Sequence, residues 1–418
     1  MKVFFRNIHL YLSLAAGIVI FCSCLTGTIL VFEKEINQAL NPQYYRVEAK
    51  GGRMPIALLV KAALRQIPKS KPASVLVYND PTRSVEVSVT LPGKKASGTP
   101  HPEKTQERIK TDAEHGKKDK KPNEGRKPVI TVFVNPYTGQ VLGQYSKKES
   151  FFTTVEMLHR FLLAGKDSAG DMIVGICTLL FLFILITGVI LWWPKTKAIL
   201  RQRIKVKWDG STKRLVHDLH LVTGFYTSVF LIVIVLTGLI MSFKWANATL
   251  FALTGSKQTD KQEAPHSKLI AAQKPISIDA AMQSVNPQIK TSEYYNLRLP
   301  ADSAAAYNFN ILPKGAFENT ADAYFIDQYS GRIIGSELFG SKSLGQRVRS
   351  FVKPVHTGAV YGVSTKILSF IVCLLACIFP VTGMMMWLNR IGKKPKRKNK
   401  ARPNEQVRVV GHGELVEP

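Results

Sequence analysis

The sequence predicts an α-helical membrane protein with four transmembrane helices in two repeats and two α+β domains outside the membrane. Three observations lead to this fold class. Four long segments contain no charged residue, basic residues gather in the short connections between these segments, and several motifs occur twice along the 418-residue chain. Each predicted element follows from one of these observations.

The uncharged segments are long enough to cross a membrane. They contain 22 to 25 residues each, at 10–32, 172–193, 219–243 and 367–388. At about 1.5 Å per residue, a helix of this length spans a hydrocarbon core of about 30 Å. All five cysteines lie in these segments, so the remaining parts of the chain have neither a disulfide framework nor a cysteine-based zinc site.

Basic residues set the predicted topology. The short connection 194–218 contains eight Lys and Arg, and the segment 389–418 contains nine. Because short basic loops stay in the cytoplasm, both termini are predicted to be cytoplasmic and the two long loops extracytoplasmic. The net charge of +28 then fits contact with anionic membrane lipid, and nucleic-acid binding is not expected.

The outer loops are expected to fold as α+β domains. Helical periodicity predicts helices at 55–67 and 277–285. Alternating apolar residues predict strands at 74–78, 84–91, 129–134, 294–299, 305–312 and 323–326. The full set of predicted boundaries is as follows: transmembrane helices at 8–32, 172–193, 219–243 and 361–388; outer domains at 33–150 and 244–355; a disordered insert at 93–127; an outer interfacial helix at 151–171; a basic cytoplasmic loop at 194–218; and a basic cytoplasmic tail at 389–418.

The second half of the chain repeats motifs of the first. His9 and His220 each lie 18 residues before a glycine of a Thr-Gly pair, and His159 and His356 each precede a span that contains Thr-Gly. The turn motif Asn135-Pro-Tyr-Thr-Gly139 matches Asp327-Gln-Tyr-Ser-Gly331, with glycine at the position that favours positive φ. Both halves therefore have the same topology, as in repeats related by an axis along the membrane normal.

Four histidines at the ends of spans are the candidate cofactor ligands. His9 and His220 lie at inner ends, and His159 and His356 lie on the outer side. A single histidine there is usually a polar group among lipid headgroups, but an ionisable residue at a span is a functional candidate. Two-fold repetition brings equivalent histidines together, and two axial imidazoles can hold one haem iron. The sequence therefore predicts two b haems, one held by His9 and His220 and one by His159 and His356.

Two features leave alternatives open. His217 lies one turn before His220, so it could be the inner ligand, a hydrogen-bond donor to that ligand, or a surface residue. His220 is preferred because it is in register with His9. The Thr-Gly pairs could let a flat ring approach, but close packing between helices is the favoured interpretation.

These motifs together resemble the PepSY-associated transmembrane helix family. The matching residues are His9 with Leu25-Thr26-Gly27, Leu158-His159-Arg160, Thr187-Gly188 followed by Trp192-Trp193-Pro194, Asp218-Leu219-His220, and His356-Thr357-Gly358. The resemblance implies a bacterial inner-membrane protein with two periplasmic PepSY-like domains. Some members are haem-containing reductases of ferric siderophores.

The leading hypothesis is a di-haem electron carrier that reduces a periplasmic ferric siderophore or other ferric chelate. No Gly-x-Gly-x-x-Gly motif is present, so the electron donor is expected to be quinol or a cytoplasmic reductase. The alternative is a membrane-anchored PepSY regulator or inhibitor of an extracytoplasmic peptidase, without haem. A transporter is disfavoured because the middles of the spans contain no acidic or basic residue.

Overall fold

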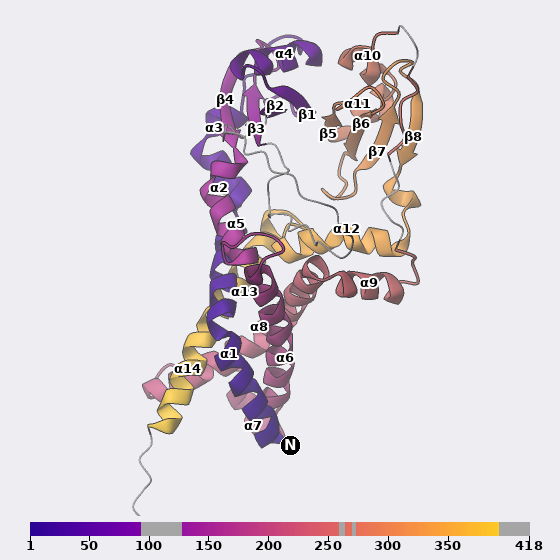
Figure 1. Ribbon diagram of the computed structural model, residues 1–418. Coiled ribbons are helices and arrows are strands. Elements are labelled where there is room, and N and C mark those ends of the chain that lie inside the picture. The colour runs from indigo at the N-terminus through magenta and orange to yellow at the C-terminus, as the bar shows by residue number, and fades with distance from the viewer. Residues whose placement is uncertain (93–127, 259–263, 270–272, 393–418) are drawn as a thin grey trace, which may run out of the picture.

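A computed structural model describes residues 1–92, 128–258, 264–269 and 273–392, and Figure 1 shows its two parts. A bundle of long helices lies at one end, and a β-sheet lies at the other. The predicted insert at 93–127 and nearly all of the predicted tail at 389–418 lie outside the described residues.

Four helical segments among the described residues are long and apolar enough to cross a membrane. They are α1 (Lys2–Leu30), α6 (Ala169–Trp192), α8 (Thr212–Ser242) and the segment Val363–Ile391. The last segment consists of α13 (Val363–Ala376) and α14 (Ile378–Ile391), which are separated at Cys377. Pro380 explains this break, because its ring clashes with the preceding helical turn and it has no N–H to donate. The chain is therefore a membrane protein with four candidate spans.

The spans pack as a closed bundle. α6 contacts both α1 and α8, and α13 and α14 contact the same two helices from the other side. The centre of the bundle contains Ala16, Leu231 and Ala376, which are almost fully buried. α1 and α8, which carry His9 and His220, thus face each other across the bundle.

Two of the spanning helices continue past their uncharged segments and include charged residues. α1 begins at Lys2 and α8 at Thr212, which is before the predicted start at 219. The Ser211 side chain accepts a hydrogen bond from the Arg214 N–H and so caps α8. Long basic side chains at helix ends can reach the headgroups, so a span continues as a helix past the apolar core.

The strands of both outer loops form one antiparallel sheet. The first loop supplies β1 (Lys71–Tyr78), β2 (Val85–Thr90), β3 (Val129–Val134) and β4 (Val141–Ser146). The second supplies β5 (Ser292–Arg298), β6 (Tyr307–Pro313), β7 (Asp322–Ile326) and β8 (Ile333–Glu337). The strand order is β4-β3-β2-β1-β5-β6-β7-β8, and β1 pairs with β5 at the centre.

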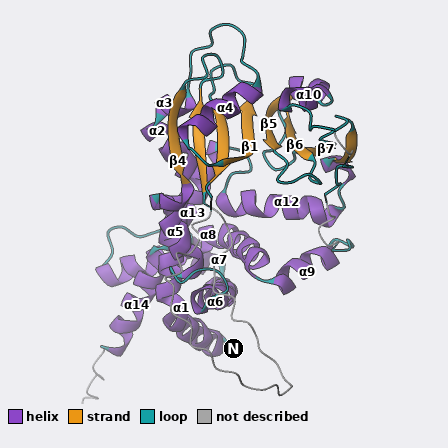
Figure 2. Ribbon diagram, turned by 45° about the horizontal axis from the view of Figure 1, so that its top comes forward, coloured by secondary structure: helices purple, strands orange, loops and turns teal. Residues whose placement is uncertain are grey.

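The strands of the two predicted outer domains thus form one continuous sheet. If the halves were separate, β1 and β5 would each leave a row of backbone groups unpaired at an edge. Their pairing, with Leu76 opposite Asn296, satisfies both edges. Valines and aromatics from both halves then share one hydrophobic core under α4 (Ile56–Gln66) and α10 (Ile278–Gln283). Figure 2 shows these two helices on the same face of the sheet.

Most of the predicted outer elements are present, and the two turn motifs are hairpins. Residues Gly139 and Gly331 both have φ of +71°, as their place in the repeated motif predicts. These turns lead into β4 and β8, the two edge strands, which the sequence pattern did not predict. A short helix, α11 (Asn286–Lys290), also follows α10.

Shorter helices connect the spans to the sheet. On the side of the bundle that carries the sheet, called the sheet side, lie α2 (Glu33–Leu40), α3 (Pro42–Tyr45), α5 (Phe151–Phe161), α9 (Lys244–Leu253) and α12 (Leu344–Thr357). The opposite side, called the loop side, has α7 (Lys197–Arg203). The helix predicted at 151–171 ends at Phe161, and a turn with positive φ at Leu162, Leu163 and Gly165 separates it from α6.

Candidate functional site

The four candidate histidines form two pairs, one near each side of the bundle. His9 on α1 lies beside His220 on α8, with ring centroids 6.4 Å apart and ring planes at 85°. His159 on α5 lies beside His356 on α12, with centroids 6.3 Å apart and planes at 61°. We call these the loop-side pair and the sheet-side pair. Both partnerships are those that the internal repeat predicts.

In the sheet-side pair, each imidazole binds the neighbouring span through Nδ1. His159 Nδ1 lies 2.9 Å from the carbonyl oxygen of Ser23 and 3.1 Å from Oγ1 of Thr26. His356 Nδ1 lies 3.0 Å from the carbonyl oxygen of Ile234 and 3.2 Å from Oγ1 of Thr237. The two contacts are equivalent by the repeat, because each carbonyl stands three residues before its threonine.

The loop-side pair follows the same pattern with one difference. His9 Nδ1 lies 3.0 Å from the carbonyl oxygen of Ile184 and 3.1 Å from Oγ1 of Thr187 on α6. His220 Nδ1 lies 2.8 Å from Oγ1 of Thr382 on α14. Among the described residues, Thr382 is the one hydrogen-bond partner of this Nδ1, whereas the other three rings also bind a backbone carbonyl.

The groups around Nδ1 determine which nitrogen of the imidazole carries the proton. Each threonine hydroxyl donates to the backbone carbonyl four residues earlier, over 2.7 to 2.9 Å. A hydroxyl has one proton, so it can only accept a hydrogen bond from the histidine. His9, His159 and His356 also face a backbone carbonyl, which can only accept, so in these three rings Nδ1 carries the proton and the lone pair is on Nε2. A neutral imidazole with a free Nε2 lone pair is the form that binds a metal.

The glycine of each Thr-Gly pair makes room for the imidazole. A Cβ atom on Gly27, Gly188 or Gly238 would lie 3.3 Å from Cε1 of the histidine on that pair, and one on Gly383 would lie 3.6 Å away. We call each threonine with its glycine a Thr-Gly seat. The favoured interpretation from sequence, packing between helices alone, missed this role. The shared spacing did not reveal it, because the 18-residue interval joins His9 to Gly27, which contacts His159.

Burial keeps the sheet-side pair neutral. Burial, and then the nearby His356, lower the pKa of His159 to about 4, and burial also lowers the pKa of His356. Both α5 and α12 lie outside the spans, and these rings are half-buried where they contact α1 and α8. The neutral form that metal ligation requires is therefore the stable one near neutral pH.

The spacing within each pair fits two imidazoles on one metal ion. A ligating histidine nitrogen lies about 2 Å from its metal and about 1 Å from its own ring centre, so the two centroids lie roughly 6 Å apart. The observed separations are 6.3 and 6.4 Å. Ligating rings are free to rotate about the metal–nitrogen axis, so both interplanar angles are compatible. A haem needs only two protein ligands of this kind, because its macrocycle supplies the four in-plane nitrogens.

Each pair stands near one end of the spans. On α1, His9 precedes the Thr26 seat of His159 by 17 residues, which is about 25 Å along a helix axis. The same interval separates His220 from Thr237 on α8. This distance is close to the thickness of a hydrocarbon core, which is about 30 Å.

The other candidate residues lie outside the pairs. His217 is exposed, and its Nδ1 lies 3.3 Å from Oδ1 of Asp218. Asp218 is buried and also accepts a 2.7 Å hydrogen bond from Arg214. Arg160, which follows His159, pairs with Glu156 at 3.1 Å on the same helix. Within the described residues no group of three or more His, Cys, Asp or Glu could hold a bare metal ion.

Comparison with protein families gives one match. The model described as the PepSY-associated TM region matches residues 6–390. This range includes both histidine pairs, all four Thr-Gly seats and the whole sheet. The comparison with curated proteins gave no match.

Proposed function

We propose that this chain, which belongs to the family of the PepSY-associated TM region, is a di-haem electron-transfer protein that reduces a ferric siderophore or other ferric chelate. The observation that best supports this proposal is the presence of two histidine pairs, the loop-side pair and the sheet-side pair. Each pair has centroids 6.3 to 6.4 Å apart, and each ring is held through Nδ1 with Nε2 left free.

The residues of the chain would hold and orient each haem. His9 and His220 would hold one haem, and His159 and His356 would hold the other. Bound haem would supply one-electron transfer between iron(II) and iron(III). The Thr-Gly seats fix the direction of each ring and increase its basicity through the hydrogen bond at Nδ1. The span-long interval between the pairs supports transfer across the membrane.

The proposed orientation places the sheet in the periplasm of a bacterial inner membrane. The eight Lys and Arg of the loop 194–218 favour the cytoplasm for the loop side and for both termini. Each half of the sheet, with its covering helix, would be one PepSY-like domain. Quinol or a cytoplasmic reductase would supply electrons to the loop-side pair. Reduction would release iron because oxygen chelators hold iron(II) more weakly than iron(III).

The visible spectrum of the purified full-length protein tests this proposal. We expect a low-spin b-type spectrum after dithionite reduction, with about two haems per chain. His9→Ala and His159→Ala should each remove one haem and leave the other. His217→Ala is the matched control and should keep both, because His217 is exposed and belongs to neither pair.

Ferric-chelate reduction is the second measurement. Prereduced protein should be reoxidised by a ferric chelate in both wild type and His217→Ala. A colourless wild-type protein, produced with sufficient haem, would refute the redox function. That result would favour the alternative of a membrane-anchored regulator of an extracytoplasmic peptidase.

A further inference from the structure

Four aromatic side chains form a cluster on the sheet side, two of them exposed and two half-buried. They are Phe317 in the β6–β7 loop, Phe339 in the short 3-10 helix η2 (Phe339–Ser341), Phe351 on α12, and Tyr361 before α13. The ring of Phe317 lies 5.6 Å from those of both Phe351 and Tyr361, and Phe339 lies 6.2 Å from Phe351. Phe317 is 44% exposed and Tyr361 is 69% exposed. We call these four residues the aromatic platform.

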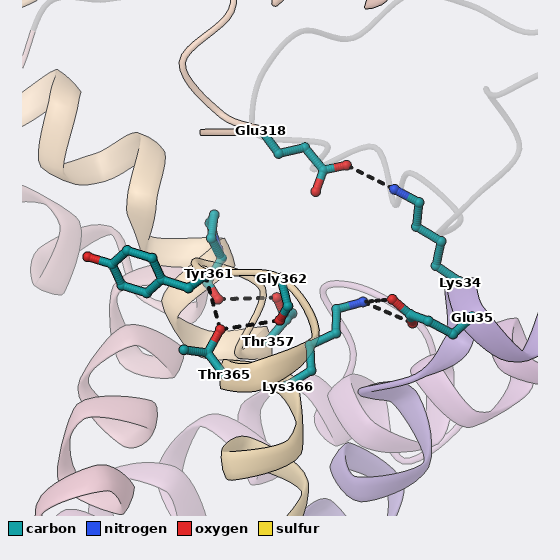
Figure 3. Close-up of polar contacts among 9 residues, drawn as sticks. Lys34, Glu35, Glu318, Thr357, Tyr361, Gly362, Thr365 and Lys366 are labelled. Carbon is teal, nitrogen blue, oxygen red and sulfur yellow. Dashed lines mark hydrogen bonds and ion pairs between the residues drawn. The ribbon is translucent and has the colours of Figure 1, made fainter. Parts of the chain in front are cut away.

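The platform adjoins the sheet-side histidine pair. Phe351 stands five residues before His356 on α12, about 8 Å along the helix axis, and Tyr361 follows His356 by five residues, just past the end of α12 at Thr357. The segment around Tyr361 is held in place, because its N–H donates to Oγ1 of Thr365 over 3.0 Å, as Figure 3 shows. The β6–β7 loop is also fixed, since the Asn319 side chain donates to the Ser350 carbonyl on α12 over 3.0 Å.

Two lysines lie near the platform, and one of them, Lys353, also interacts with the carboxylate of Glu33 on α2. The ammonium group of Lys342 lies 5.8 Å from the ring centroid of Phe339, and Lys353 on α12 is exposed. The neighbouring carboxylate, Glu318, is paired with Lys34 at 3.3 Å (Figure 3). The platform therefore combines exposed aromatic faces with cations and suits an aromatic anion.

Comparison of the two repeats indicates that the platform is not simply a set of aromatic anchors at the membrane interface. The offset of 197 that aligns His159 with His356 puts Thr154 and Ala164 opposite Phe351 and Tyr361. The offset of 192 between the turn motifs puts Lys147 opposite Phe339. Aromatic residues that only anchor a span among headgroups would be needed in both halves. The first half lacks them at these three positions, so the platform belongs to one half alone.

We infer that the aromatic platform is the docking site for the acceptor, and that this acceptor is an anionic ferric chelate with aromatic ligands of the catecholate class. The inference rests on the proposed function for the presence of iron and goes beyond it in naming the ligand class and the contact surface. Rings of the chelate stack on Phe317 and Tyr361, and Lys342 beside Phe339 balances part of its negative charge. Bound there, the chelate lies beside His356, at the sheet-side pair.

Binding of a redox-inert chelate tests the inference without depending on haem. The full-length protein in detergent is titrated calorimetrically with gallium(III) tris-catecholate and, separately, with gallium(III) tris-acetohydroxamate, which is aliphatic and uncharged. Phe317→Ala and Tyr361→Ala should each weaken catecholate binding about tenfold, as expected for the loss of one stacking ring. Lys342→Gln should weaken it less, and hydroxamate binding should be weak and unchanged in every variant.

Phe151→Ala is the matched control, because Phe151 is 65% exposed on α5 and lies outside the platform. It should bind the catecholate like wild type. Equal catecholate binding by wild type and both platform variants, or equal loss in the control, would overturn the inference. Either result would leave the haem spectrum and ferric-chelate reoxidation unaffected, so the proposed function could survive. If a colourless protein binds the catecholate normally, the docking site stands and the proposed redox function fails.

Discussion

At the residue scale, the candidate site depends on which ring nitrogen of each histidine carries the proton. Three of the four histidines face a backbone carbonyl, which can only accept, so these three donate from Nδ1. The sequence could predict the four histidines because they recur at the ends of repeated spans. It could not predict their seats, because the contact between His159 and Thr26 joins two helices whose relative rotation depends on packing.

The one unequal seat provides a prediction. Thr382→Val removes the hydroxyl that hydrogen-bonds with Nδ1 of His220, whereas Thr26→Val leaves His159 bound to the Ser23 carbonyl. Losing one net hydrogen bond costs about 1 kcal/mol, or roughly fivefold in affinity. We therefore expect Thr382→Val to weaken retention of the loop-side haem by about that factor and to raise its reduction potential. Haem content and a spectroscopic redox titration measure this, with Thr26→Val as the milder control. Equal effects of the two variants would contradict the assigned seat.

At the scale of elements, a strand could be predicted from the sequence where the core covers one of its faces. The strand predicted at 84–91 matches β2, where buried and half-buried side chains alternate. β4 and β8 were not predicted, because they are edge strands with hardly any buried side chain and so show no alternation. The pairing of β1 with β5 was also beyond prediction, since each strand looks alike whether its neighbour comes from its own half or the other.

A cap between the halves gives a prediction for this scale. The carboxylate of Asp279 on α10 accepts hydrogen bonds from the Ile56 and Ala57 N–H groups, at 2.8 and 3.2 Å, and so caps α4 of the other half. Asp279→Ala should lower the stability of the sheet by about 0.5–2 kcal/mol. Thermal unfolding followed by circular dichroism measures the loss. Asp279→Asn keeps one accepting oxygen and should lose less, so an equal loss in both variants would argue against capping.

At the scale of the whole molecule, the two halves meet at more than one level. The sheet joins them at β1 and β5, and α2 joins them nearer the spans. There, Lys366 on α13 donates to both carboxylate oxygens of Glu35 at 2.7 and 3.0 Å, as Figure 3 shows. The repeat predicted the equal topology of the halves but could not predict this contact. The offset of 195 that aligns the Thr-Gly seats of α6 and α14 puts Asp171 opposite Lys366, so the link exists once.

The difference in burial between two neighbouring ion pairs decides what each contributes. The Lys366 side chain is only 12% exposed, whereas both partners of the Lys34–Glu318 pair are more than half exposed. Glu35→Gln removes the charge that faces a nearly buried ammonium group, and should cost on the order of 1–3 kcal/mol. Lys34→Gln breaks a solvated pair and should cost about 0–1 kcal/mol. Thermal unfolding of the two variants at low and high salt compares them directly. If Glu35→Gln unfolds at the same temperature as Lys34→Gln, then the halves are held together by the sheet and the bundle, without help from α2.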